Sequence, residues 1–266
     1  MDNRPIGIFD SGLGGLTAAK ALRELLPNED IIYFADSGRC PYGPRPASQL
    51  RRMAVQDMDF TAARGVKAII AACGTVSSNA PDLLDGYRLP VFGVLKAGVA
   101  EMSRTEGAAP LGVIATEASI KSGSFARALG ALCPGREIIS IACPEFVPLI
   151  ERGFGSGDGE VAAAVERALG PLKAAGAAAL LLACTHYGII GEAISAYLGA
   201  GTRIVGAADC AARQLRDYLV ENGLTGGSGR ESYYTSGSPE EFSRMAALFL
   251  GRALGAQALR VPVMEA

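Results

Sequence analysis

Short apolar runs alternate along the chain with longer segments of helical periodicity. The runs are continuous in Val, Ile, Leu and Ala, which is typical of parallel strands covered by helices on both faces. The expected strands are Ile6–Phe9, Ile31–Ala35, Ala68–Ala72, Val91–Val94, Leu111–Ala115, Glu137–Ile141, Ala178–Ala183 and Arg203–Val205. The expected helices are Thr17–Leu26, Ser48–Arg64, Ala97–Thr105, Ser119–Leu129, Gly159–Ala174, Ala207–Glu221 and Pro239–Leu254. This alternation predicts an α/β fold with right-handed crossovers.

Two short segments, one in each half of the chain, are similar in sequence. KAIIAACGT (67–75) resembles AALLLACTH (178–186), because each is an apolar run that ends in Ala-Cys and then meets a Thr. Each half therefore places one cysteine, Cys73 or Cys184, at the carboxyl end of a buried strand. Ligands bind at that end of the strands in open α/β sheets.

The composition excludes several classes of partner. Hydrophobic residues make up 49% of the 266 positions, enough for one large core or two smaller ones. A formal net charge of -2, without a long basic run, creates no field that would attract nucleic acid or an anionic membrane. The uncharged stretch between Lys173 and Glu192 contains Thr185, His186 and Tyr187, so a buried strand and turn explain it better than a membrane span.

The cysteines favour free thiols over a metal site. No two of them form a C-x-x-C pair, and His186 is the single histidine, which argues against a zinc ribbon or finger. No secretory signal is visible, so we expect a cytoplasmic protein with reduced thiols, most of them small buried hydrophobes. The cysteines are Cys40, Cys73, Cys133, Cys143, Cys184 and Cys210.

Two turn-rich segments could hold an anion. DSGLGGLT (10–17) follows the first strand, but its spacing is not G-x-G-x-x-G and it has no Walker lysine, so nucleotide binding is poorly supported. Its Asp10 fits a helix cap as well as a functional role. CPYGPRP (40–46) is a rigid loop, and from spacing alone a structural turn is favoured over a rim that holds a carboxylate.

Two thiols in matching context suit one particular chemistry. Cys73 and Cys184 each stand at an expected helix start, where the helix dipole lowers a thiol pKa, and His186 can hold or accept a proton of Cys184. Inversion of a Cα centre removes a proton from one face and adds one to the other, which two acid/base groups do most directly. Asp10 and His186 could then tune one thiol each. A Cys–His hydrolase is the alternative, but it does not explain the second cysteine.

Six segments, in this order, resemble the glutamate racemases of the aspartate/glutamate racemase family. They are DSGLGGLT, FADSGRCPYGPRP, ACGT, GVIATEASIKS, CPEFVPLIERG and ACTHY. The resemblance implies two similar doubly wound parallel-sheet domains that face each other across an active-site cleft. We place the first domain at residues 1–97 with 209–266 and the second at 98–208. The resemblance also implies a cytoplasmic homodimer that needs no metal or other cofactor. Such a protein converts L-glutamate to D-glutamate and so supplies D-glutamate for peptidoglycan.

The resemblance assigns roles to individual residues. Cys73 matches the thiol that exchanges the proton of D-glutamate, and Cys184 the thiol that serves L-glutamate. Asp10 and His186 match residues that assist these thiols, and Glu151 matches a further acidic residue near the site. The substrate-binding positions are Ser11, Pro41, Tyr42, Gly43, Gly74, Thr75, Thr116, Ser119 and Thr185.

Three positions depart from the family pattern. Gly74 stands where the family has Asn, which removes a side chain expected at the substrate, while Ser119 replaces Thr and Gly188 replaces Pro. Two alternatives therefore stay open. One is a racemase of another acidic amino acid such as aspartate. The other is a protein that binds an acidic ligand and has lost efficient catalysis.

Overall fold

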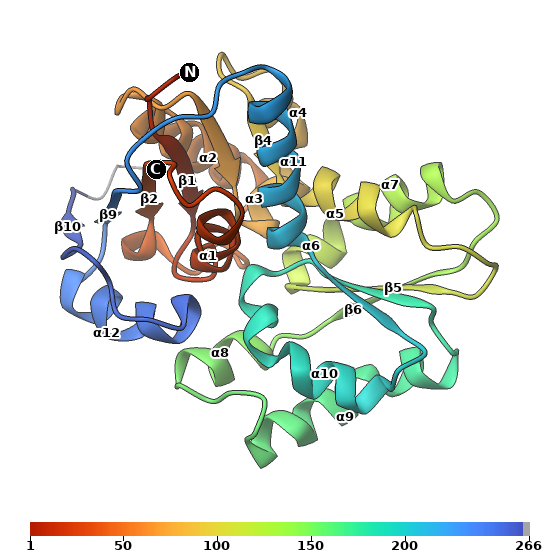
Figure 1. Ribbon diagram of the computed structural model, residues 1–266. Coiled ribbons are helices and arrows are strands. Elements are labelled where there is room, and N and C mark those ends of the chain that lie inside the picture. Colours follow the sequence, from red (N-terminus) through yellow and green to blue (C-terminus); the bar gives the residue numbers. More distant parts are fainter. Residues whose placement is uncertain (263–266) are drawn as a thin grey trace.

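Within residues 1–262, which the computed structural model describes, ten strands form two sheets whose neighbouring strands are all parallel (Figure 1). The first sheet, in spatial order, contains β10 (Leu259–Arg260), β9 (Glu231–Thr235), β2 (Ile31–Ala35), β1 (Ile6–Asp10), β3 (Ala68–Ala71) and β4 (Val91–Gly93). The second contains β6 (Ile138–Ala142), β5 (Leu111–Ala115), β7 (Ala179–Leu182) and β8 (Arg203–Gly206). The predicted fold class, two parallel-sheet α/β domains, is confirmed.

Helices connect the strands and cover the sheets. They are α1 (Leu16–Leu25), α2 (Ala47–Ala62), α3 (Gly74–Asn79), α4 (Pro81–Asp85), α5 (Val94–Met102), α6 (Glu117–Ser122), α7 (Ser124–Leu132), α8 (Phe146–Glu151), α9 (Gly159–Ala174), α10 (Gly191–Leu198), α11 (Ala207–Glu221) and α12 (Pro239–Leu250). Two short 3₁₀ helices, η1 (Ser37–Arg39) and η2 (Thr185–Ile190), follow β2 and β7. None of the helices in the described part of the chain is long and apolar enough to cross a membrane.

Burial explains why the positions of the central strands could be predicted from the sequence. β1, β3, β5 and β7 are buried along their whole length, because helices cover both faces of each sheet. The edge strands β4 and β6 are half-buried. All eight expected strands are present, with ends that differ by no more than one residue.

The differences from the predicted elements have local causes. β9 and β10 were missed, because ESYYT in β9 alternates in burial and lacks a continuous aliphatic run. The single helix expected at 119–129 is two helices, since Gly123 adopts a left-handed φ of 66° between α6 and α7. The last helix ends at Leu250 for the same reason, with Gly251 at a φ of 70°.

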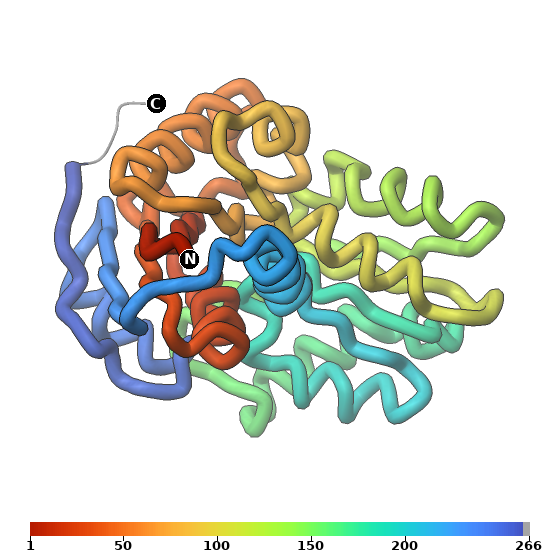
Figure 2. Tube along the Cα trace, turned by 45° about the horizontal axis from the view of Figure 1, so that its top comes forward, coloured from red at the N-terminus to blue at the C-terminus, as the bar shows by residue number. Residues whose placement is uncertain are grey.

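The chain crosses from the first sheet to the second and returns. α11 packs against α1 and α5 where the two halves meet (Figure 1). Beyond α11, the returning segment passes beside the N-terminus (Figure 2). There the buried Lys67 ammonium lies 2.6 Å from the Glu29 carboxylate and donates to the carbonyls of Asp2 and Leu224. The domain boundaries at residues 97 and 208 stay predictions.

The core of the second sheet can be tested with one matched pair of substitutions. Leu181 is fully buried in β7, whereas Leu132, at the end of α7, is 56% exposed. Leu181→Ala is expected to lower the free energy of unfolding by about 2–5 kcal/mol, because it leaves a cavity in a close-packed layer. Leu132→Ala should change it by less than about 0.5 kcal/mol. Urea unfolding of both variants measures the difference, and equal effects would contradict this description of the core.

Candidate active site

The two cysteines singled out in the sequence line one small cavity between the sheets. Cys73 follows β3 and precedes α3, and Cys184 follows β7 and precedes η2. Both are buried, and the cavity they share has a volume of about 70 Å³. It lies at the carboxyl ends of parallel strands from both sheets, where such folds bind ligands.

The segments that form the cavity bring together every site residue predicted from the sequence. Besides the two cysteines, the lining contains Asp10, Ser11, Pro41, Tyr42, Gly43, Gly74, Thr75, Thr116, Ser119, Glu151, Thr185 and His186. It also contains three residues that were not predicted, Cys40, Val147 and Ala183. Cys40 belongs to the CPYGPRP loop and could have been included, whereas Val147 carries no chemical signal in the sequence. The individual roles stay predictions.

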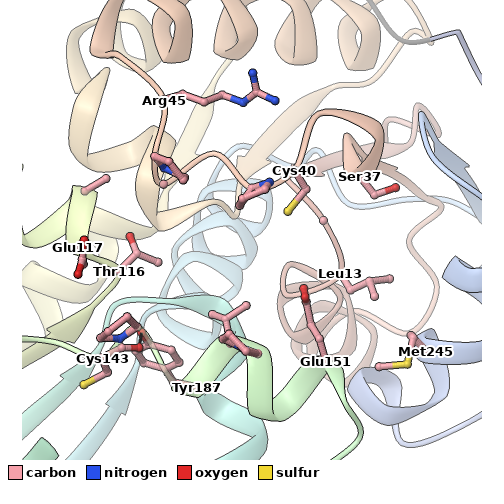
Figure 3. A pocket seen from close by; sticks show the side chains of 18 of the residues that line it. Leu13, Ser37, Cys40, Arg45, Thr116, Glu117, Cys143, Glu151, Tyr187 and Met245 are labelled. Carbon is pink, nitrogen blue, oxygen red and sulfur yellow. Dashed lines mark hydrogen bonds between the residues drawn. The ribbon is translucent and has the colours of Figure 1, made fainter.

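A larger cleft opens next to this cavity. It has a volume of about 940 Å³ and shares Cys40, Thr116 and Glu151 with the smaller cavity. In Figure 3, Cys40 and Glu151 come from opposite walls, and Met245 of α12 lies to one side. The cleft therefore gives the smaller cavity a route to solvent.

Asp10 organises the turn after β1. One carboxylate oxygen accepts from the Gly12 N–H at 2.8 Å, and the other accepts from the Thr185 hydroxyl at 3.3 Å. Burial raises the pKa of this carboxyl, and the nearby His186 opposes that rise. Asp10 is not the cap of the next helix, because α1 begins only at Leu16.

Close packing requires glycine at position 14 of this turn. A Cβ at Gly14 would lie 2.3 Å from Nδ1 of His186, which is closer than any side chain allows. The turn can therefore approach the second half of the chain only with glycine at this position. Within DSGLGGLT, Gly14 thus serves the contact between the two halves, and Asp10 and Ser11 line the cavity.

Cys73 is held in a dry environment on the first-sheet side. Its thiol donates to the Ser11 hydroxyl at 3.4 Å. Burial raises the pKa of the Cys73 thiol to about 12, and the Asp10 carboxylate adds to the rise. The prediction that the helix dipole lowers this pKa is wrong, because α3 is only six residues long and desolvation outweighs its dipole.

On the second-sheet side, three ionisable side chains, Cys184, His186 and Glu151, contact one another in series. Its sulfur lies 3.9 Å from Nδ1 of His186, and Nε2 of His186 lies 3.1 Å from the Glu151 carboxylate. Burial lowers the pKa of His186, but the hydrogen bonds to Cys184 and Glu151 outweigh it and raise the pKa to about 10. The imidazole is therefore mainly protonated at neutral pH, between a sulfur and a carboxylate.

Hydroxyl groups line the wall between Cys73 and the second sheet. The Thr75 and Thr116 hydroxyls are 3.2 Å apart, the Thr116 and Ser119 hydroxyls 3.1 Å, and the Ser78 hydroxyl donates to Ser119 at 3.2 Å. These groups can reorient to donate or accept, so they can bind the charged ends of an amino acid. Among residues 1–262, no group of three or more His, Cys, Asp and Glu side chains is arranged to hold a metal ion.

Gly74 packs closely against the turn that follows β7. A Cβ at this position would lie 2.2 Å from the Ala183 carbonyl oxygen and 3.8 Å from Cα of Cys184. Gly74 also lines the cavity, and its expected role at the substrate stays a prediction. Here the position faces the backbone that carries the other cysteine.

The fold and the paired thiols define a class of protein, and comparison with known proteins agrees with it. Residues 17–215 match the family model described as Asp/Glu/Hydantoin racemase, and the chain belongs to this family. Among the members of this family, the chain is similar to glutamate racemases. A glutamate racemase from Beutenbergia cavernae is 37% identical, over 94% of this chain and 91% of that protein.

Solved structures of glutamate racemases superpose on the whole chain. The enzyme from Francisella tularensis, in complex with D-glutamate, has a TM-score of 0.89 and 36% identity and covers 99% of both chains. The enzyme from Thermus thermophilus, in complex with beta-chloro-D-alanine, has a TM-score of 0.88 with the same identity and coverage. The chain is thus an amino-acid racemase whose close relatives are glutamate racemases.

The contact at Gly74 predicts a stability effect. Gly74→Ala is expected to lower the free energy of unfolding by about 1–3 kcal/mol, because the new methyl group must displace the Ala183 backbone. Gly130→Ala in α7 is the matched control. Its methyl group meets nothing within 4 Å, so the helix should gain up to about 1 kcal/mol. Thermal unfolding of both variants measures the difference, and a stabilising effect at Gly74 would contradict the contact.

The raised pKa of Cys73 predicts the pH dependence of its alkylation. Burial disfavours the thiolate, so Cys73 stays mainly a thiol until the pH nears about 12. The rate of alkylation by iodoacetamide at this residue should rise about tenfold per pH unit, beyond the pH at which free cysteine levels off. Peptide mass spectrometry follows the rate at Cys73. A plateau near neutral pH would contradict the direction of the shift.

Proposed function

We propose that this protein interconverts L- and D-glutamate by moving the Cα proton between Cys73 and Cys184. The observation that carries the proposal is that these two thiols, from different sheets, line one small cavity of about 70 Å³. A cysteine hydrolase needs a single thiol. A second thiol in the same cavity suits a reaction that handles a proton on both faces of one carbon atom.

The comparisons support glutamate as the substrate. The relative from Beutenbergia cavernae is named a glutamate racemase, and the structure from Francisella tularensis contains D-glutamate. All cavity-lining residues predicted from the glutamate racemase motifs meet here. This agreement favours glutamate over aspartate, even though Gly74 departs from the family pattern.

The proposed reaction conserves protons at each step. A thiolate on one face takes the Cα proton, and the electron pair left on Cα delocalises into the substrate carboxylate. The thiol on the other face then gives its proton to Cα, which inverts the configuration. One sulfur has gained a proton and the other has lost one, so the reverse reaction uses the same two groups with exchanged roles.

Each sulfur has its own assisting groups. Ser11 and Asp10 lie on the Cys73 side, where the high pKa keeps the sulfur protonated at neutral pH and makes its thiolate a strong base for the Cα proton. On the Cys184 side, His186 can exchange a proton with the sulfur through Nδ1, while Glu151 keeps the imidazole oriented through Nε2. The two sides therefore differ in how their sulfur regains its starting protonation state.

The cavity also has to stabilise the carbanion-like intermediate. The Cα–H bond of an amino acid is very weakly acidic, so hydrogen bonds to the substrate carboxylate must strengthen as charge develops there. Hydroxyls of Ser11, Thr75, Thr116 and Thr185 line the cavity and can supply them. Burial makes each such bond stronger than it would be in water. A supply of D-glutamate to peptidoglycan, a cytoplasmic location and a homodimer stay predictions from the resemblance.

The two-thiol mechanism predicts the outcome of single substitutions. Cys73→Ala and Cys184→Ala should each lower the racemisation rate by at least roughly 10²–10⁴-fold, because each removes one of the two proton carriers. Each variant can still exchange the Cα proton of one enantiomer. Circular dichroism of L- and D-glutamate measures racemisation, and NMR in deuterated water measures exchange at Cα.

Cys133→Ala is the control, because Cys133 lies outside the cavity at the end of α7 and should leave the rate unchanged. Racemisation by either alanine variant at the parent rate would falsify the mechanism. Faster inversion of aspartate than of glutamate by the parent would instead contradict the proposed substrate.

A further inference from the structure

A buried cluster of ionisable side chains lies behind the loop that rims the cavity. We call it the Asp57 cluster, and it consists of Asp36, Arg39, Tyr42 and Asp57. Asp36 follows β2, Arg39 ends η1, and Asp57 lies within α2. Asp36 and Asp57 have no exposed surface, and Arg39 and Tyr42 are 4% and 2% exposed. Only Tyr42 of these four lines the cavity, so the mechanism above makes no use of the others.

Hydrogen bonds link the members of the cluster to one another and to Ser236. Arg39 donates to Asp36 at 2.5 Å through Nε and to Asp57 at 2.9 Å through Nη2. The Tyr42 hydroxyl is hydrogen-bonded to Oδ2 of Asp57 at 2.8 Å and also to Oδ2 of Asp36. The Ser236 hydroxyl donates to the other oxygen of Asp36 at 2.7 Å.

The number of protons in these contacts does not match two ionised carboxylates. A tyrosine hydroxyl has one proton, yet Tyr42 bonds two carboxyl oxygens, so one of these bonds needs a proton from a carboxyl group. Two carboxylates and one guanidinium would also leave a net negative charge with no access to solvent, which is costly. One carboxyl proton resolves both problems.

That proton belongs on Asp57. Both oxygens of Asp36 already accept, from Arg39 and Tyr42 on one side and from Ser236 on the other. Asp57 accepts from Arg39 through Oδ1, which leaves Oδ2 free to donate to Tyr42. Burial and the neighbouring Asp36 raise the pKa of Asp57 well above its usual range, which agrees with this placement.

Tyr42 connects the Asp57 cluster to the wall of the cavity. Pro41, Tyr42 and Gly43 are consecutive and all line the cavity, so the anchored Tyr42 side chain fixes the backbone that faces the substrate. Arg45 reinforces the same loop by donating to the Arg39 carbonyl at 2.5 Å.

We propose that Asp57 is a positioning residue: in its neutral form it donates a hydrogen bond to Tyr42 and so holds residues 41–43 in place for the substrate. This inference rests on the proposed function for its kinetic test. It adds a residue of α2 that lies outside the cavity and does not touch the substrate.

The proposal predicts different effects on KM when asparagine replaces Asp57 and when it replaces Asp36. Asp57→Asn should keep KM for glutamate within about twofold of the parent, because its amide N–H donates to Tyr42 and its oxygen accepts from Arg39. Asp36→Asn should raise KM about tenfold with a smaller fall in kcat, because its amide N–H would face either the donors of Arg39 and Tyr42 or the Ser236 hydroxyl. That hydroxyl already accepts from the Gly38 N–H and would lose the acceptor of its own proton. Asp57→Ala should also raise KM about tenfold, since it removes both bonds. Initial rates with L- and D-glutamate provide these values.

Glu29→Gln controls for a merely structural role. Glu29 is also a buried carboxylate in an ion pair, with Lys67, but it does not line the cavity. This variant should lose thermal stability and keep the parent KM. An Asp57→Ala variant that behaves in this way would overturn the positioning role, as would an Asp57→Asn variant that raises KM as much as Asp36→Asn.

Infrared spectroscopy tests the proton without any assay of activity. The difference spectrum between parent and Asp57→Asn should show the loss of one protonated-carboxyl C=O band. No such loss would overturn the neutral form of Asp57. If the parent fails to racemise glutamate but the band is lost, then the proposed function fails and the protonation of Asp57 stands. If Asp57→Ala does not fold, the contrast between Asp57→Asn and Asp36→Asn decides the positioning role.

Discussion

The contact between Gly74 and the Ala183 carbonyl is the constraint on which the rest of the site depends. It brings the turn after β3 against the turn after β7, with no room for a side chain between them. Cys73 and Cys184 are the neighbours of these two residues and therefore line one cavity. Inversion of a carbon centre needs both thiols at one cavity, so this approach of the two turns is what the proposed chemistry requires.

Burial then sets the chemistry of the groups around this contact. It raises the pKa values of Asp10 and Cys73, because a charge there loses its hydration. His186 keeps its proton only because Cys184 and Glu151 outweigh the same effect. The adjacent cleft admits solvent up to Cys40 and Glu151, so the dry region is confined to the cavity itself.

Periodicity and motifs in the sequence predicted the buried strands and the residues that meet at their ends. Strands such as β5 and β7 were readable because they are aliphatic along their whole length. β9 was not, because ESYYT alternates in burial and contains no continuous aliphatic run. The pKa of Cys73 could not be predicted either, since the depth of burial is set by both halves together. The Asp57 cluster joins three separate elements, and no local pattern marks Asp57 in α2 as a partner of Tyr42.

A crystal structure of the protein with D-glutamate tests the central claim most directly. The two-thiol mechanism predicts that Cα of the ligand lies between the sulfurs of Cys73 and Cys184, about 3.5 Å from each and on opposite faces. A ligand whose Cα reaches only one of these sulfurs, or meets both on the same face, would contradict it.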